Sequence, residues 1–314
     1  ATVRAIDIDT SIQPVAALLG LFQSLPYNIA RFRSAEFEAL LQQILRDEQL
    51  DLVQMEGSYQ ALFIPGIRAV APNIPIVLRS HNVEYKIWQR VHENESNPLK
   101  KAYFGQLYRK IEAWEKRTLH DFDAVIAMTE EDANWYRDQG FSGNLRTISA
   151  GVDLRQYQNP DGALNHRRIA FIGSMEWAPN VQGTKWLVEE IWPGVHADNR
   201  DAELHLAGKN PAEWMGEWGN VPGVTFHGMV PDAADFMASS GIFAVPLRAG
   251  GGMRLKIVEA LAMGRCVVST DVGAEGIDLR PGVDFVRANT VEAFRRVILE
   301  LLQQPDRVAE IARS

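Results

Sequence analysis

The chain has little cysteine and no long apolar run. Its 314 residues include one cysteine, Cys266, which excludes an internal disulfide and leaves no Cys-x-x-Cys pair for a metal. No stretch approaches the ~20 apolar residues of a membrane-spanning helix. Basic residues are outnumbered, 32 against 40 acidic ones, giving a net charge of −8, which argues against nucleic-acid binding through bulk charge. These features favour a cytoplasmic protein of about two domains, at ~100–200 residues per domain.

Strand-like and helix-like segments alternate through most of the chain, with no internal repeat and no low-complexity tract. This alternation predicts an α/β fold with mostly parallel sheets covered by helices. The polar, turn-rich segment 158–167 is the best linker, so we expect one domain over residues 1–157 and another over 168–314. The first clear strand comes only near Asp51, and no leader pattern precedes it. We therefore expect the sequence to begin inside the first domain, without that domain's first strand.

The most informative stretch runs from Pro246 to Gly276 and has the pattern of strand, glycine loop, helix, strand and loop. Its three consecutive glycines, at 250–252, allow backbone amides to come close to a ligand. The helix that follows begins with partial positive charge and unpaired N–H groups, an arrangement that suits a phosphate. Arg254 and Lys256 add two formal positive charges, so the stretch predicts a site for a diphosphate.

Glu259 lies in the second turn of this helix. Because Lys256 and Glu259 are three residues apart, an exposed ion pair is an equally good interpretation of the helix alone. The interval from Met253 to Glu259 corresponds to roughly 9 Å of helix. A diphosphate at the helix start would therefore bring its ribose near this carboxylate, which can accept hydrogen bonds from both ribose hydroxyls.

The same stretch allows a dinucleotide-binding interpretation. Asp271 follows the glycines by about 20 residues, where NAD-binding proteins place the acid that binds ribose. The Gly-x-Gly-x-x-Gly pattern fails, because counting from Gly250 puts Leu255 at its third glycine. NAD binding is the weaker alternative, and a cofactor titration tests it.

Several segments resemble, in order, those of the family 4, or group 1, glycosyltransferases of the GT-B fold. PLRAGGGMRLKIVEALAMGRCVVSTDVGAEG is similar to their donor-binding motif, and RSHNVEY to a first-domain segment of a bacterial polysaccharide branch. Further matches are ISAGVDLRQY, FIGSMEWAPNVQG, LAGKNP and FHGMVPD. The resemblance implies two Rossmann-like domains, with a nucleotide sugar held by the second and the acceptor by the first. It implies retaining transfer, without metal or cofactor, to a saccharide or lipid-linked acceptor in bacterial polysaccharide synthesis.

Two departures from the family pattern affect the predicted site. Of the two glutamates in the family's E-x7-E motif, Glu259 matches the second, the implied ribose ligand. The first falls on Gly251, so the carboxylate that usually touches the donor sugar is missing, and Glu275 is a candidate replacement. The usual Arg and Lys of the second domain's first loop are missing too. We hypothesise that Arg254 and Lys256, with the glycine-loop amides, compensate the diphosphate charge.

Other candidates lie at strand ends, where open parallel sheets bind ligands. His81 is as well explained by a local structural hydrogen bond, but the resemblance implies a neutral hydrogen-bonder to the donor sugar or its phosphate. Gly173 and Ser174 fit an ordinary loop capped by Asn180 equally well, and Lys209 is by default a solvated lysine. The predicted catalytic residues are His81, Arg254 and Lys256. The predicted donor-binding residues are Gly173, Ser174, Lys209, Gly250, Gly251, Gly252, Met253, Arg254, Lys256 and Glu259.

The missing charged residues keep other functions open. A catalytically silent GT-B protein that binds sugar or acts as a scaffold is one, and a GT-B epimerase is another. A phosphorylase would need a phosphate site or a pyridoxal lysine that the sequence does not identify. Peripheral membrane association also stays open, because basic pairs such as Lys100–Lys101 and Arg109–Lys110 are sparse.

Overall fold

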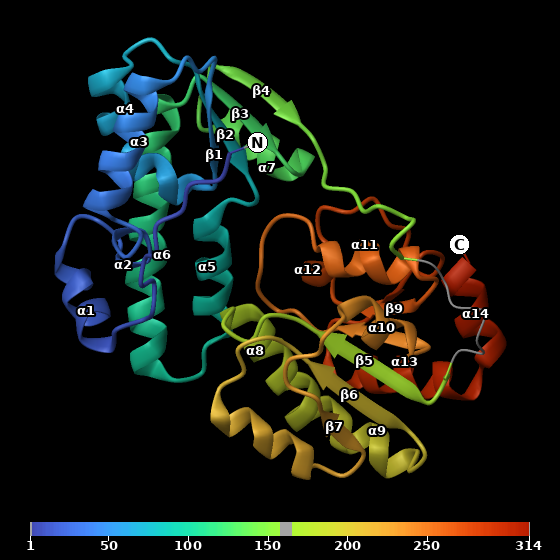
Figure 1. The fold of residues 1–314 in the computed structure, drawn as a ribbon. Helices are drawn as coiled ribbons and strands as arrows, with labels where there is room; N and C mark the ends of the chain where they lie inside the picture. The colour runs from blue at the N-terminus through green and yellow to red at the C-terminus, as the bar shows by residue number, and fades with distance from the viewer. Residues whose placement is uncertain (1, 158–164, 314) are drawn as a thin grey trace. The chain divides into compact units, whose positions relative to one another are not determined.

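The chain forms two compact units, Ala1–Ser149 and Ala150–Ser314, in a computed structural model that describes residues 2–157 and 165–313 (Figure 1). Each unit is a parallel sheet with helices, which confirms the predicted fold class. The division precedes the predicted boundary at residue 157, because Tyr157 packs against the core of the second unit. Residues 158–164 of the predicted linker lie outside the described residues.

The first unit contains a four-stranded sheet in the order β1-β2-β3-β4, with every neighbouring pair parallel. Its strands are β1 (Val53–Glu56), β2 (Ile76–Ser80), β3 (Ala124–Ala127) and β4 (Asn144–Thr147). Its helices are α1 (Pro14–Leu19), α2 (Tyr27–Ala30), α3 (Ala35–Asp47), α4 (Ile64–Val70), α5 (Glu84–Asn94), α6 (Pro98–Thr118) and α7 (Glu130–Asp138). From α3 onward, strands and helices alternate through most of the unit, as the sequence predicts.

Local sequence signals explain where these helices begin. The Ser34 hydroxyl accepts from the Phe37 amide at 3.1 Å and starts α3, as a side-chain cap should. Between β1 and β2 the chain forms a 3-10 segment, Ser58–Phe63, followed by α4. Proline suits the first turn of an α-helix, and α4 has one there.

A buried carboxylate joins α6 to the start of α5. Glu115 is 4% exposed, and its side-chain oxygens accept from the Glu84 and Tyr85 amides at 3.0 and 2.9 Å. Ser58 donates its hydroxyl to the same carboxyl at 3.0 Å. Burial raises the pKa of Glu115 to about 8 and outweighs these hydrogen bonds, and the nearby Glu84 raises it further.

We expect the stability of this unit to fall as pH rises from about 5 to about 8. Over that range Glu115 ionises in the unfolded chain but keeps its proton in the folded one, because its pKa is raised on folding, so unfolding releases protons. Urea denaturation at pH 5.5 and pH 8 measures the difference. Glu115→Gln should flatten the profile, whereas Glu112→Gln, on the same helix beside Lys116, should keep it. A wild-type profile without slope would contradict this assignment.

The second unit contains a six-stranded parallel sheet in the order β10-β9-β8-β5-β6-β7. Its strands are β5 (Arg168–Ile172), β6 (Glu203–Ala207), β7 (Val224–Phe226), β8 (Ile242–Val245), β9 (Cys266–Ser269) and β10 (Val286–Arg287). Its helices are α8 (Ala178–Trp186), α9 (Trp192–Asp198), α10 (Ala233–Ala238), α11 (Leu255–Ala262), α12 (Asp271–Ala274), α13 (Val291–Gln303) and α14 (Pro305–Arg313). The loop expected after β9 contains the short helix α12, because Thr270 caps it by accepting from the Gly273 amide.

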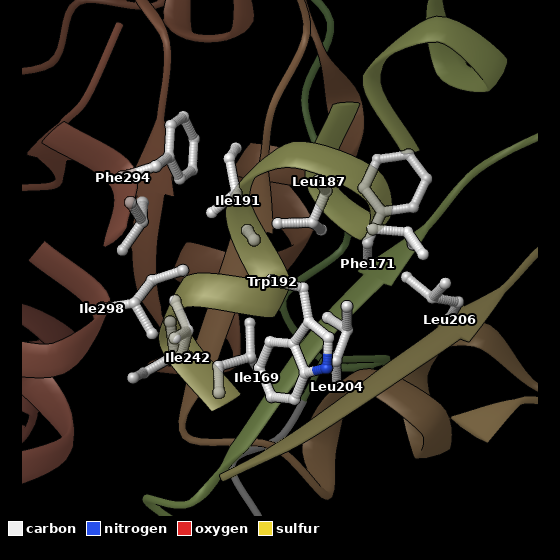
Figure 2. Packing of buried hydrophobic residues seen from close by; sticks show 14 of the residues in the cluster. Ile169, Phe171, Leu187, Ile191, Trp192, Leu204, Leu206, Ile242, Phe294 and Ile298 are labelled. Atoms are coloured by element: carbon white, nitrogen blue, oxygen red, sulfur yellow. The ribbon is translucent and has the colours of Figure 1, made fainter. Parts of the chain in front are cut away.

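Alternate residues of these strands supply two separate cores. One face packs against the helices α8, α9, α13 and α14, and the other against α10 and α11. On the first face, Trp192 lies beside Ile169 and Leu204 (Figure 2), and its indole N–H donates to the Pro222 carbonyl at 2.8 Å. The sheet is therefore covered on both faces, as its near-continuous apolar strands require. Within the described residues, no helix is both long and apolar enough to cross a bilayer.

Candidate donor site

The strand order of the second unit reverses between β5 and β8. In open parallel sheets, ligands bind at such a switch point, beyond the carboxyl ends of the strands. The predicted loops meet here, because Gly173 and Ser174 follow β5 and the glycine loop follows β8. A Cβ atom built on Gly173 would lie 2.7 Å from Lys256 Nζ. The structure thus brings together residues that are far apart in the sequence.

The glycine loop has the backbone conformation that only glycine adopts readily. Gly250 has φ 147° and Gly252 has φ 68°. Arg254 folds back under the loop, where Nη1 donates to the carbonyls of Gly251 and Gly252 and Nη2 donates to that of Val272 at 3.0 Å. The loop is therefore held by a side chain at its own end.

These contacts give Arg254 a structural role beside the predicted one. The side chain is 4% exposed, and its Nη2 lies 3.7 Å from Glu275, the candidate replacement for the missing sugar carboxylate. Arg254 thus shapes the loop and is bonded within the protein, and Glu275 faces that guanidinium. Direct contact of Arg254 with a diphosphate stays a prediction, and Lys256 is the better placed of the two cations.

Lys256 lies in a half-buried position between β5 and α8. Its Nζ donates to Asn180 Oδ1 at 2.9 Å and lies 4.6 Å from the centre of the Phe171 ring. Burial lowers the pKa of Lys256 to about 7, and the positive charge of Arg254 lowers it further, against the opposing effect of Glu259. An anion that reached this amine would favour its protonated form.

Asn180 connects Lys256 to the loop after β5. Its Nδ2 donates to the Ser174 carbonyl at 2.8 Å, and the residue is 3% exposed. It does not cap the helix, because α8 begins at Ala178. Sequence reasoning missed Asn180 and Phe171 as site residues. An amide at a buried position in the first turn of a helix is the signal that would have found Asn180.

We expect Gly173→Ala to weaken nucleotide-sugar binding by about tenfold, the scale of one hydrogen bond to a charged group. The added Cβ would lie 2.7 Å from both Lys256 Nζ and Asn180 Nδ2. Both are side-chain ends that can shift, so thermal stability should change little. Gly216→Ala is the control, because a Cβ there meets no atom within 4 Å. Titration calorimetry measures the difference, and equal affinities for the two variants would refute the placement of Lys256.

Glu259, on α11, accepts a hydrogen bond from the Tyr157 hydroxyl at 2.9 Å. This bond to Glu259 raises the pKa of Tyr157. The tyrosine fixes one carboxylate oxygen, and a carboxylate has further lone pairs for other donors. Tyr157 ends the segment ISAGVDLRQY. Its contact with Glu259 joins residues that are far apart in the chain, so local sequence patterns do not predict it.

The other predicted residues lie around the same strand ends. Lys209 is exposed on the loop after β6, and its carbonyl accepts from the Met175 amide at 3.0 Å. That bond ties the loop after β6 to the loop after β5. Met253 is half-buried, two residues before α11. Within residues 2–157 and 165–313, no group of three or more His, Cys, Asp or Glu side chains could hold a metal ion.

The first unit has its own polar cluster at the carboxyl ends of β1 and β2. His81 Nε2 lies 2.8 Å from Glu56 Oε2, and Gln54 donates to Glu56 Oε1 at 2.6 Å. Burial raises the pKa of Glu56, but the hydrogen bonds from Gln54 and His81 and the charge of Arg79 outweigh it and leave the pKa below its usual range. An ionised Glu56 holds the His81 proton on Nε2, so the neutral imidazole predicted from the sequence offers Nδ1 as an acceptor.

Two units, each a parallel sheet with helices, and a glycine loop at the strand-order reversal of the second define a two-domain α/β class of protein. The family model described as "Glycosyltransferase Family 4" matches residues 13–156, and that described as "Glycosyl transferases group 1" matches residues 166–304. The chain belongs to the family 4, or group 1, glycosyltransferases of the GT-B fold, as the resemblance predicted.

Individual relatives are distant. An uncharacterised 44.6 kDa protein in the cps region of Klebsiella pneumoniae is 23% identical over 308 residues, covering 95% of this chain and 77% of that protein. TarM has a TM-score of 0.68 at 17% identity over 88% of this chain, and the chain spans about half of TarM, 53% of its length. HepE of Anabaena, in complex with UDP-glucose, has a TM-score of 0.62 at 15% identity, covering 98% of this chain and 91% of HepE. At these identities, the solved structures establish the fold alone.

Proposed function

We propose that this chain catalyses retaining transfer of a sugar from a nucleotide-diphosphate sugar to a saccharide or lipid-linked acceptor, in bacterial polysaccharide synthesis. The observation that carries the proposal is the arrangement of α11 at the switch point of its sheet. Its start receives the glycine loop, its first turn carries Lys256, and its second turn carries Glu259. The proposed phosphate, cation and ribose positions therefore follow one another along this helix.

The glycine loop and Lys256 are the proposed diphosphate site. Backbone amides at a helix N-terminus attract anions, and the Lys256 amine adds a charge that half-burial strengthens. Glu259, oriented by Tyr157, is the proposed acceptor of the ribose hydroxyls. In the proposed site these groups compensate the charge of the leaving diphosphate, and the proposed transfer is metal-independent and needs no cofactor.

Stabilising the leaving diphosphate is the main proposed catalytic device, because such preorganised charge is usually the largest contribution to catalysis. His81 is the proposed contact from the first unit, with Nδ1 accepting from a donor-sugar hydroxyl while Glu56 fixes the ring. Retention requires the acceptor to add on the face that the diphosphate leaves. The cytoplasm, where nucleotide sugars are made, is the proposed location.

Relatives supply the first donors to test. HepE has been solved with UDP-glucose, and S. aureus TarM with fondaparinux, alpha-GlcNAc-glycerol and UDP. The Klebsiella relative is named from its cps region, which favours a polysaccharide acceptor. We therefore expect UDP-sugars to bind before GDP- or ADP-sugars.

A donor-hydrolysis screen with UDP-, GDP- and ADP-sugars tests the proposal. Release of nucleotide diphosphate above background, removed by Lys256→Met, supports an enzyme. Nucleotide binding without turnover on any acceptor favours the silent GT-B protein, and conversion of the donor sugar without transfer favours an epimerase. The anomeric configuration of the product, read by NMR, decides between retention and inversion.

We expect His81→Gln to lower kcat roughly 10–100-fold while changing UDP affinity less than threefold, because His81 is assigned to the sugar and not to the nucleotide. Glu56→Gln should lower kcat in the same direction but less, since it acts through the imidazole. Steady-state kinetics and calorimetry with UDP separate the two quantities. Equal losses in kcat and UDP affinity would instead indicate a structural role for His81.

A further inference from the structure

The segment from Thr10 to Ala30 has no charged residue and exposes several large apolar side chains. No charged residue lies between Asp9 and Arg31. Val15, Leu18, Leu19 and Phe22 are 72%, 58%, 58% and 89% exposed. Their spacing of three, four and seven residues places them on one face of the helical stretch formed by α1 and the 3-10 turn Gly20–Phe22. A soluble surface rarely carries such a contiguous apolar face without a partner.

The opposite face of this segment is fixed to the protein. Ala17 and Gly20 are buried, and a Cβ on Gly20 would lie 2.9 Å from Tyr27 Cβ. Lys110 of α6 donates to the carbonyls of Gly20, Leu21 and Gln23. The apolar residues are thus held outward on a defined helix end.

A basic face of α6 adjoins this apolar face. Together with Ser24, this face of α6 lines a cavity of about 220 Å³. The lining residues of α6 recur at helical spacing and are Gln106, Arg109, Lys110, Ala113, Trp114 and Arg117. This lining has three cations and no carboxylate. The Arg109 guanidinium lies over the Tyr108 ring and that of Arg117 over the Trp114 ring. Among the residues that the structure describes, neither arginine forms an ion pair with a carboxylate.

We propose that the face formed by Val15, Leu18, Leu19 and Phe22, together with the basic face of α6, docks on the anionic surface of a lipid bilayer. Apolar side chains enter the interface while arginines at the same edge contact lipid phosphates. The charge argues against a second copy as the occupant, because a two-fold pairing of this surface would bring its own cations together. The proposal does not rest on sugar transfer.

Vesicle flotation of the full chain, without donor or acceptor, tests the proposal. Vesicles of phosphatidylcholine with 30% phosphatidylglycerol (a mole fraction of roughly that size gives a clear negative surface potential) should retain the protein, and pure phosphatidylcholine much less. Each large apolar side chain contributes roughly tenfold in partitioning. Leu18→Ser with Phe22→Ser should therefore lower binding at least tenfold at both low and high salt. Arg109→Gln with Arg117→Gln should lower binding at low salt and remove its salt dependence.

Matched control variants distinguish binding through this surface from non-specific adsorption to vesicles. Met229→Ser removes an apolar side chain of similar exposure, 72%, in the second unit, and Arg296→Gln removes a charge from α13; both should float as wild type does. Circular dichroism verifies that each variant is folded. Failure of the wild-type chain to float, or flotation of both paired variants like wild type, overturns the proposal. So does a wild-type dimer that Phe22→Ser dissociates without any loss of flotation.

Discussion

Lys256→Met should reduce kcat/KM for the nucleotide-sugar donor by about 100–1000-fold, the usual loss when one preorganised charge-stabilising group is removed. Met keeps most of the side-chain volume over the Phe171 ring but removes the amine that lies 2.9 Å from Asn180 Oδ1. The fold should not suffer, because a half-buried amine with a lowered pKa is a cost to stability. Donor kinetics and a thermal melt, taken together, measure both effects.

Lys185→Met provides the control for this substitution. Lys185 lies on α8 with its side chain 57% exposed, in an ion pair with Glu189, so its loss should leave donor kinetics unchanged. If Lys256→Met turned over within threefold of wild type, the diphosphate charge would have to be compensated elsewhere, with Arg254 the first alternative.

The same lysine predicts how donor binding depends on pH. Its pKa of about 7 means that the amine is mostly protonated at pH 6 and mostly neutral at pH 8.5. A diphosphate binds the protonated form better, so its Kd should rise by up to about tenfold per pH unit above 7. Calorimetry at pH 8, in buffers of different ionisation enthalpy, should show uptake of a proton on binding. Lys256→Met should abolish that uptake.

Glu259→Gln should raise the KM for the donor roughly 10–100-fold, the scale of one or two hydrogen bonds to a charged group. The amide can still accept from Tyr157, which donates at 2.9 Å, but offers one acceptor oxygen in place of two. The loss should shrink towards wild type with a donor whose ribose lacks the 2′ and 3′ hydroxyls. That dependence on the ligand distinguishes ribose contact from general damage to α11.

Two further variants make this test specific. Tyr157→Phe should produce a smaller rise in KM with the same dependence on the ribose hydroxyls, because it acts only through the carboxylate. Glu300→Gln, on α13 beside Arg296, removes a surface carboxylate and should have no effect. An unchanged penalty with the deoxyribose donor would place Glu259 outside the ribose site.

The glycine loop and its helix are the part of the site that the sequence predicts best. Three adjacent glycines followed by a helical pattern are a local signal. The positive φ angles of Gly250 and Gly252 are a second reason for glycine at this place, beside the close approach of the backbone to a ligand. The strands were predictable for the same reason, since apolar runs bounded by turn residues report on their own neighbourhood.

The rest of the site depends on contacts between distant segments. Lys256 meets Asn180 and Phe171 only because β8 pairs with β5, and strand order is not written in local patterns. The burial of Arg254 beneath its own loop likewise follows from three-dimensional packing, so the sequence indicates only the formal positive charge of this residue. Sequence reasoning missed the short helix α1, because this apolar stretch has no capping side chain and no polar residues at helical spacing.

Arg254 has a mechanical consequence. Its guanidinium donates hydrogen bonds to the carbonyls of the glycine loop, and Arg254 is also the N-cap residue of α11. We therefore expect the loop and the helix to move as one rigid segment. The amides of the glycine loop, Lys256 and Glu259 all belong to that segment and should move together. Any motion that admits or releases a donor is therefore expected to preserve the distances between these groups. Its backbone changes should occur in the residues that flank the glycine loop and α11.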